Sequence, residues 1–445
     1  MGGWPVEAGA EFVHGTNSAF TRLCAEFAAE DAAAARAAAP NAAAAAAAAT
    51  PLSFVEKPWP DRWWLGRDRL LTSDEPEEIA RLHEIMDAVG DERPPPPGRD
   101  VSADTWLRDT KKATPLMLAA AEACYANDFG ARLSELGLRE MIAENNAWDS
   151  GETYLVMEQP MSRVAERLAR GLEVWLSWPV ARLDSGGGGG SGNGGGNGFG
   201  GVLLERAPPS SPPSSGAAAP INSSRPRAIR AARVVVTVPL GVLKAGRIAF
   251  CPPLPSRKRL SVERLRFGNA VKIVLAFSRR FWPDDLYDVV CTDELVPEFW
   301  MTRRPVTDGA NAHLQPVTGF CAGAAADAVA AMGAAAAVRA FVAQLDRVFG
   351  APGDPRPASD SLAKSAVFDW ARQEHALGAY SFPSLGAEDG DREALAAPLP
   401  CGRVFFAGEA THGAVNPCMQ AALETGDRAA AQVRASLGER PSSRL

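Results

Sequence analysis

The sequence of 445 residues lacks several features that define other classes of protein. No apolar run approaches the roughly 18 residues that a membrane-spanning helix needs, and the start, MGGWPVEAGAEF, has neither the basic nor the apolar region of a secretory signal. The seven cysteines are odd in number and form no CxxC pair, and the five histidines are scattered. We therefore expect no membrane span, no disulfide framework and no metal site, in a reducing compartment.

Basic charge is also in deficit, because 46 Lys and Arg face 53 Asp and Glu and leave a net charge of −7. This balance argues against nucleic acid as a partner and is compatible with cationic small molecules. A hydrophobic fraction of 46% is normal for a globular protein. The length is sufficient for two domains, each with its own core.

The most informative stretch begins at Arg403 and reads RVFFAGEATHGAVNPCMQAALETGDRAA. A short apolar β-run ends at Gly408, and Glu409 follows it. Asn416 and Pro417 predict a helix start, since Asn caps free N–H groups and Pro lacks the N–H that would stay unpaired. A carboxylate after a strand can hold ribose or ribityl hydroxyls, and a helix start attracts negative charge. An ordinary strand–loop–helix with a solvated Glu409 remains an open alternative.

Four stretches, in order along the chain, resemble the flavin amine oxidases, the family of polyamine oxidases, monoamine oxidases and histone lysine demethylases. They are VEAGAEFVHG at 6–15, VVVTVPLGVLK with FGNAVKIVLAFSRRFWP, FDWARQEHALGAYS, and FAGEAT with its following helix. The resemblance is closest to polyamine oxidases. It implies FAD as cofactor and an α/β fold: a two-domain FAD/NAD(P)-binding, glutathione-reductase-like flavoprotein fold, with a substrate domain of mixed sheet plus helices.

One part of the family pattern is missing. The family begins with a βαβ unit whose GxGxxG turn brings a pyrophosphate to a helix N-terminus, and this sequence shows no such unit at its start. The Gly-rich run at 186–201 has linker composition and opens no helix. We therefore expect an FAD domain that is truncated at its N-terminus by about 30 residues or more. A non-catalytic fragment or a flavin-free binding homologue is accordingly one alternative.

The resemblance divides the chain into two domains that are both discontinuous. The FAD-binding domain is expected from residues 1–50, 151–260 and 395–438, and the substrate domain from 51–150 and 261–394. Within the former, the Gly- and Pro-rich stretch 185–228 reads as a disordered insert, and 439–445 as a flexible tail.

Lys272 is the candidate catalytic residue. It lies in VKIVLAF, a predicted strand with apolar residues at both parities, where an ammonium is costly unless it is paired or hydrated. An edge-strand lysine that extends its amine to solvent would satisfy the same pattern. The resemblance implies that Lys272 holds a water against the flavin N5.

The resemblance assigns the amine pocket to aromatic and imidazole side chains. Trp370 and Tyr380 would form walls beside the flavin, where aromatic faces suit an amine, and His14 would face the substrate. Core burial of the aromatics, and a histidine satisfied by backbone, stay open. Cys418 stands where polyamine oxidases usually place a second tyrosine, so a sandwich of two tyrosines around the amine is not expected.

The remaining candidates would contact the cofactor. Gly9 would let the backbone approach the flavin ring, Val180 would pair with the adenine, Glu409 would hold the ribityl chain, and the Met419 N–H would stabilise negative charge on the ring. The complete cofactor set is Glu7, Gly9, Ala10, Val180, Gly408, Glu409 and Met419.

The function implied is FAD-dependent oxidation of amines, with polyamines such as spermine and spermidine as substrates and hydride transfer to flavin followed by reoxidation with O2 to H2O2. A histone methyl-lysine demethylase is the alternative with the same chemistry. The last residues, Ser443-Arg444-Leu445, are close to the peroxisomal address SKL. We therefore expect recognition by the peroxisomal import receptor, with a cytoplasmic location as the alternative.

Overall fold

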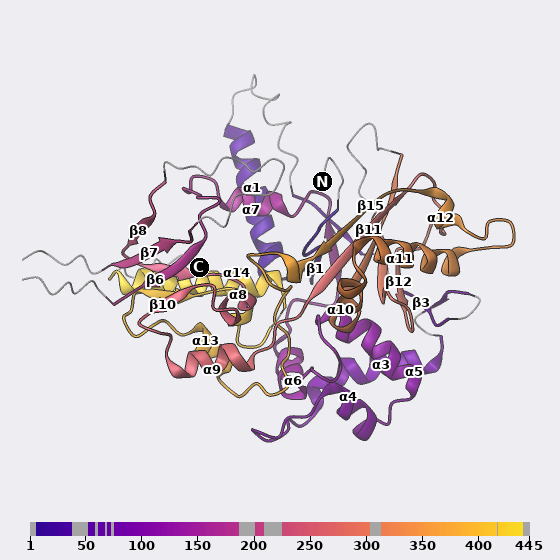
Figure 1. Ribbon diagram of the computed structural model, residues 1–445, viewed down its shortest axis with the longest axis horizontal. Coiled ribbons are helices and arrows are strands. Elements are labelled where there is room, and N and C mark those ends of the chain that lie inside the picture. The colour runs from indigo at the N-terminus through magenta and orange to yellow at the C-terminus, as the bar shows by residue number, and fades with distance from the viewer. Residues whose placement is uncertain are drawn as a thin grey trace, which may run out of the picture.

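The computed structural model describes residues 6–37, 52–57, 61–66, 69–72, 75–186, 201–208, 225–302, 313–415 and 417–438. The molecule is elongated, and its elements gather toward two ends (Figure 1). One end holds a large mixed sheet with helices, and the other holds smaller sheets beside a long C-terminal helix. This is the α/β arrangement expected from the sequence, with a mixed sheet plus helices on one side.

The large sheet has seven strands in the order β15-β11-β14-β13-β12-β3-β4. All neighbours run antiparallel except β12 and β3, which are parallel. Every residue of β11 is buried, which explains the apolar residues at both parities of its sequence. The strands are β3 (Arg62–Trp64), β4 (Leu71–Thr72), β11 (Ala270–Phe277), β12 (Asp288–Cys291), β13 (Glu298–Met301), β14 (Gln315–Ala322) and β15 (Leu362–Asp369).

One face of this sheet is covered by α10 (Gly323–Met332) and α11 (Ala334–Phe349), with α12 (Pro357–Ser361) at its end. Phe341 of α11 packs against Phe299 and against Gly319, where a side chain would lie 2.6 Å from its ring. Among the described residues no single helix is long and apolar enough to cross a bilayer; α10 and α11 reach that length only together, across a bend of 119°.

Helices from the stretch 77–147 pack at the β3–β4 end of the sheet around Trp63 and Val290. Thr114 caps the Met117 N–H and Pro115 occupies the first turn of α5, the favoured start of a helix. The group comprises α3 (Glu77–Asp87), η2 (Ala88–Asp91), α4 (Ala103–Thr105), η3 (Trp106–Thr110), α5 (Pro115–Ala121), η4 (Glu122–Ala126) and α6 (Leu138–Ala147).

The other end contains a parallel pair, β9 (Val234–Val236) with β16 (Val404–Phe406), and a sheet of order β10-β6-β7-β8. The strands of that sheet are β6 (Val180–Asp184), β7 (Val202–Arg206), β8 (Ala228–Ala231) and β10 (Ala249–Cys251). The helices here are α8 (Leu240–Lys244), α9 (Ser256–Arg264), α13 (Asp391–Ala396), η6 (Glu409–Thr411) and α14 (Met419–Ser436).

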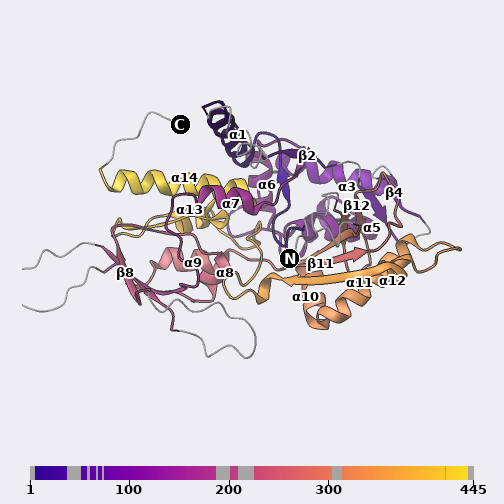
Figure 2. The ribbon, with the colours of Figure 1, turned by 90° about the horizontal axis from the view of Figure 1, so that it is seen from above.

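Between the two ends lies a third sheet of order β1-β5-β2, formed by β1 (Phe12–His14), β2 (Phe54–Glu56) and β5 (Tyr154–Met157). It packs against α1 (Ala19–Ala37) and α7 (Ser162–Leu168), and side chains of α14 join the same core. Figure 2 shows α1, α7 and α14 on one side of the molecule.

Two sequence-based expectations are corrected. The C-terminal helix begins at Met419 rather than at Pro417, because the backbone is still extended at Cys418, which precedes the first helical residue. The stretch 185–228 is not wholly disordered: β7 lies inside it, because Val202 is fully buried and Leu204 packs on the Leu183 core. Residues 187–200 and 209–224 of that stretch, and the tail 439–445, lie outside the described residues.

Candidate active site

The segment of residues 7–11, just before β1, is the point where several predicted site residues meet. The Lys272 ammonium donates to the Glu7 carbonyl at 3.1 Å. The Trp370 indole Nε1 donates to the Ala8 carbonyl at 2.7 Å, and the Glu7 carboxylate accepts from the Met161 N–H at 2.9 Å. A lysine from the large sheet and an indole from η5 (Trp370–Arg372) therefore fix one short backbone segment.

Lys272 lies in the interior of the sheet, since β11 pairs with β14 on one side and β15 on the other. The edge-strand alternative is therefore wrong. Its Nζ donates to Glu11 Oε2 at 2.9 Å, with both side chains at most 5% exposed. The ammonium also lies 5.0 Å from the centre of the Trp300 ring. Glu11 was missed by the sequence analysis, although a buried lysine requires a partner and Glu11 is an acid within the matched stretch 6–15.

Gly9 is in contact with Trp370. A side chain at Gly9 would place its Cβ 3.3 Å from Cζ2 of the indole, so a small residue lets the ring lie against the backbone. Ala10, the next predicted residue, is exposed.

Tyr380 and Glu409 are neighbours through Ser381. Glu409 accepts from the Ser381 hydroxyl at 2.6 Å and from its N–H at 3.2 Å, while the Tyr380 hydroxyl donates to the Asp128 carbonyl at 3.0 Å. Burial raises the pKa of Glu409, against the opposing effect of the Ser381 hydrogen bonds and Arg392. Burial also raises the pKa of Tyr380, so its phenol stays protonated.

Glu409 owes its position to the turn at the end of β16. Gly408 has φ of +121°, a conformation that other residues adopt at a cost. Its N–H donates to the Thr425 hydroxyl of α14 at 3.0 Å. Among the described residues no side chain caps the first turn of α14, so these residues leave its N–H groups available to a ligand. Met419 at that turn packs against the core of β1 and α1.

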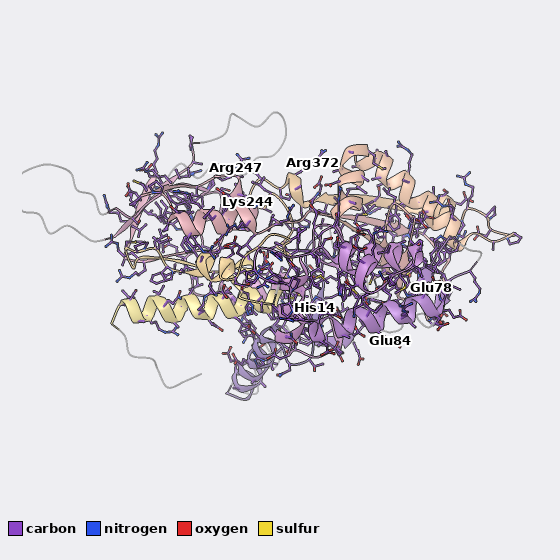
Figure 3. All side chains as sticks on the ribbon, turned by 90° about the horizontal axis from the view of Figure 1, so that it is seen from below. His14, Glu78, Glu84, Lys244, Arg247 and Arg372 are labelled. Carbon is purple, nitrogen blue, oxygen red and sulfur yellow. The ribbon has the colours of Figure 1, made fainter. Side chains whose placement is uncertain are left out.

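His14 lies beside Tyr154 and Trp148, with ring centres 4.7 Å and 5.8 Å away. Figure 3 places it near the middle of the molecule. Burial and the Lys57 ammonium lower the pKa of His14 to about 4, so the imidazole is neutral near pH 7. Cys418 is buried, packs against the same Trp148, and has a pKa raised by burial. His14 and Cys418 therefore share one aromatic neighbour.

Lys272 shares its sheet face with a group of buried acids that the sequence analysis did not single out. Lys272 and Glu298 are both directly opposite Phe320, and side chains opposite each other across a ladder share a face. Asp288 is opposite Trp300 on the same face. Contacts in tertiary structure alone bring these residues together, so no motif marks them.

Among the described residues, Lys57 contacts this acidic group. Lys57 Nζ lies 2.5 Å from Asp288 and 3.3 Å from Asp61. Burial, together with Asp288, raises the pKa of Asp61 to about 7, and burial raises that of Asp128 to about 6. Burial likewise raises the pKa of Glu298. Carboxyl groups therefore outnumber Lys57 in this group, and burial favours the neutral form of three of them.

Val180 lies apart from the other predicted residues. It begins β6 opposite Arg206, in the four-stranded sheet, and is half-buried. No hydrogen bond or ring contact found in the described part of the chain joins Val180 to the residues around Glu7 or Glu409.

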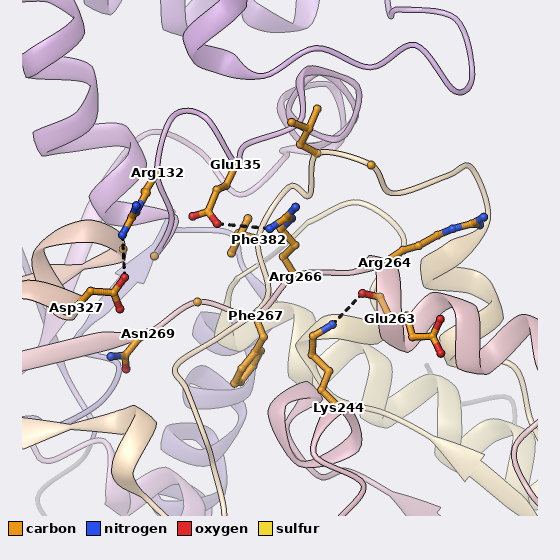
Figure 4. A pocket seen from close by; sticks show the side chains of 15 residues that line it. Arg132, Glu135, Lys244, Glu263, Arg264, Arg266, Phe267, Asn269, Asp327 and Phe382 are labelled. Carbon is orange, nitrogen blue, oxygen red and sulfur yellow. Dashed lines mark hydrogen bonds and ion pairs between the residues drawn. The ribbon is translucent and has the colours of Figure 1, made fainter. Parts of the chain in front are cut away.

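A cavity of about 790 Å³ is lined by a different group of residues (Figure 4). Lys244 lines it and donates to three backbone carbonyls at the end of α9, at 2.6, 2.7 and 3.1 Å. Arg132 pairs with Asp327 at its rim. None of the predicted site residues lines this cavity.

The comparison with known families decides the classification. The model of the flavin containing amine oxidoreductases matches residues 1–434. The chain belongs to this family. The cofactor that membership implies is FAD.

Curated relatives include both branches expected from the sequence. A lysine-specific histone demethylase 1 homolog 3 of Arabidopsis thaliana is 34% identical over 207 residues, which is 45% of this chain and 12% of the relative. A human peroxisomal N(1)-acetyl-spermine/spermidine oxidase is 29% identical over 223 residues, 44% of this chain and 41% of the relative. The chain thus matches less than half the length of each.

Solved structures agree on the fold. Cyclohexylamine oxidase from Brevibacterium oxydans IH-35A superposes with a TM-score of 0.65 at 21% identity, covering 87% of this chain and 83% of that protein. A putrescine oxidase gives a TM-score of 0.68 at 16% identity, with coverage of 97% and 88%. At these identities the likeness establishes the two-domain flavoprotein fold.

Proposed function

We propose that this protein catalyses the FAD-dependent oxidation of amines and that its substrates are polyamines. The observation that carries the proposal is the meeting of Lys272 and Trp370 on the segment 7–11. Hydrogen bonds extend this junction toward Glu409, because Gly268, two residues before β11, donates to the Tyr380 carbonyl at 2.8 Å and Ser381 binds Glu409. Family membership supplies the chemistry that these residues would serve.

The residues present fit the flavin end of FAD. Glu409 is a carboxylate at the end of a parallel strand, where it can accept from ribityl hydroxyls, and the uncapped start of α14 offers N–H groups to negative charge. When bound, FAD supplies the acceptor for a hydride from the carbon beside the amine nitrogen, and O2 regenerates it with release of H2O2. Lys272 contributes a fixed donor, and Trp370, Tyr380 and the neutral His14 line the amine site.

The buried acids support a cationic substrate. Among the described residues, Lys57 acts on four carboxyl groups, those of Asp61, Asp128, Asp288 and Glu298. Burial is the main cause of the raised carboxyl pKa values of Asp61, Asp128 and Glu298, and a second ammonium of a polyamine would favour the charged form of these groups. The human relative is an N(1)-acetyl-spermine/spermidine oxidase by name, and we extend its peroxisomal location to this chain as a proposal.

The demethylase reading is the second candidate, favoured by relatives at 34% identity. A single anaerobic experiment separates the two. The purified chain is loaded with FAD, and bleaching of the flavin absorption is followed with spermine, spermidine and a methylated lysine peptide. Bleaching by spermine or spermidine supports polyamine oxidation, whereas bleaching by the peptide alone supports demethylation. A chain that retains no FAD, or a flavin that no amine bleaches, overturns the proposal.

A pair of lysine variants refines this test. Lys272→Met removes the buried donor, and we expect it to retain FAD but to slow the oxidation of spermine by about tenfold or more, the range of a lost charge-assisted hydrogen bond. Lys364→Met is the matched control, since Lys364 is exposed on the adjacent strand β15, and it should behave as the wild type.

A further inference from the structure

Glu11 is a buried carboxylate to which neither the family pattern nor the proposed function assigns a role. It immediately precedes β1 and is 4% exposed. Its carboxylate binds Lys272 at 2.9 Å across the junction between the N-terminal segment and the large sheet. A carboxylate and an ammonium removed from water together stabilise each other only when both remain charged and well oriented.

The contacts of Lys272 fix the orientation of its ammonium group. Two of its three N–H donors are used, by Glu11 Oε2 and by the Glu7 carbonyl. The Trp300 ring lies 5.0 Å away and adds cation–π attraction. Within the described part of the chain, no protein acceptor is found for the third donor. A tetrahedral ammonium held at two of its corners has its third N–H fixed in space.

We propose that Glu11 is a positioning residue for the reaction: its hydrogen bond to Lys272, together with the bond from Lys272 to the Glu7 carbonyl, fixes the ammonium so that the remaining N–H points at one place in the active site. This inference rests on the proposed function for the role of Lys272. Loss of the Glu11 charge would leave a buried ammonium with only a carbonyl and a ring. The ammonium would then be held by fewer contacts, and its orientation would become variable.

The first test reads the lysine itself and needs no turnover. Amine-directed acetylation of the folded protein, followed by peptide mass mapping, measures the reactivity of each lysine. We expect Lys272 to be protected in the wild type and to react about tenfold or more faster in Glu11→Gln, because this variant loses the charge-assisted hydrogen bond that restrains the amine. Asp288→Asn is the matched control. It removes the carboxylate that pairs with Lys57, so it should increase the labelling of Lys57 without changing the labelling of Lys272.

The second test distinguishes positioning from a structural role. Glu11→Gln should lower kcat for amine oxidation about ten- to hundredfold with little change in KM, the range of a lost charge-assisted hydrogen bond. In the background of Lys272→Met the same substitution should have no further effect, because Glu11 acts through Lys272. Glu11→Asp keeps the charge and should recover part of the rate.

The outcomes separate the inference from the proposed function. Unchanged labelling of Lys272 in a folded Glu11→Gln protein, or effects of Glu11→Gln and Lys272→Met that multiply, would overturn the role of Glu11. Enhanced labelling of Lys272 in a protein that oxidises no amine would leave the ion pair established and overturn the proposed function instead. Melting temperatures confirm that each variant is folded when it is labelled.

Discussion

At the scale of single residues, buried charge is the recurring theme of this molecule. Lys272 and Lys57 each lie in the interior beside a carboxylate, Glu11 and Asp288. His14 is instead neutral near pH 7, because burial and the Lys57 ammonium both disfavour the imidazolium. Buried ion pairs and a buried neutral imidazole thus occur in the same molecule, and each has a consequence that can be measured.

The neutral His14 predicts a pH dependence of stability. Its folded pKa of about 4 lies below the usual 6.5, so between these values the unfolded chain binds a proton that the folded chain does not. Stability then rises with pH across this window. His14→Asn removes the titration, so relative to the wild type it should gain about 2–3 kcal/mol of unfolding free energy on going from about pH 7 to about pH 4.5.

Urea unfolding at both pH values checks this prediction. Acids with raised pKa, such as Asp61, act with the opposite sign, because the folded chain is the one that holds their protons. They are present in both proteins, so the difference between variant and wild type isolates His14. Equal differences at the two pH values would contradict the prediction.

At the scale of elements, the strand β16, the turn after it and the helix α14 form the unit that positions Glu409. Gly408 makes the turn with a φ of +121°. The Thr425 hydroxyl of α14 accepts from the Gly408 N–H and donates to nearby carbonyls, so the helix fixes the turn. Backbone conformation at a single glycine therefore determines where the carboxylate lies.

Two glycine substitutions in this unit should have opposite effects. Gly408→Ala places a side chain in a strained conformation and should cost about 1–3 kcal/mol of unfolding free energy, with weaker retention of FAD. Gly426→Ala lies within α14, where nothing is within 4 Å of an added Cβ, and should stabilise by up to about 1 kcal/mol. Denaturant unfolding measures both, and a stabilising Gly408→Ala would refute the assignment of strain.

At the scale of the whole molecule, a buried ion pair links two segments that are far apart in the sequence. Arg392 of α13 donates to Glu140 of α6 at 2.7 and 3.0 Å, and it is 2% exposed. The same guanidinium donates to the Ser381 hydroxyl and to the Phe382 carbonyl. It therefore connects the helical group to the loop that binds Glu409.

Arg392→Met should destabilise the protein by about 3–5 kcal/mol, because it leaves the Glu140 carboxylate without its buried partner. The control is Arg132→Met, which breaks a pair with Asp327 that is about half exposed and should cost less than about 1 kcal/mol. Thermal and denaturant unfolding compare the two. Equal losses in the two variants would contradict the assignment of the Arg392–Glu140 pair as a buried structural link.

The sequence by itself determined the family, the cofactor and the class of fold, because these follow from local motifs: a strand that ends at Gly408 and Glu409, a buried strand around Lys272, and their order along the chain. Local patterns placed the C-terminal helix to within two residues, since its exact start depends on the extended backbone at Cys418.

Only the tertiary structure decided how Lys272 is accommodated. Glu11 is 261 positions away from it in the chain, and Asp288, Glu298 and Lys57 meet only through strand register and packing. No local period or spacing encodes such pairs, because a charge is stabilised by whatever lies within a few ångströms in space rather than in sequence. The same holds for β7, whose strand is specified by the core it packs against and not by the Gly- and Pro-rich sequence around it.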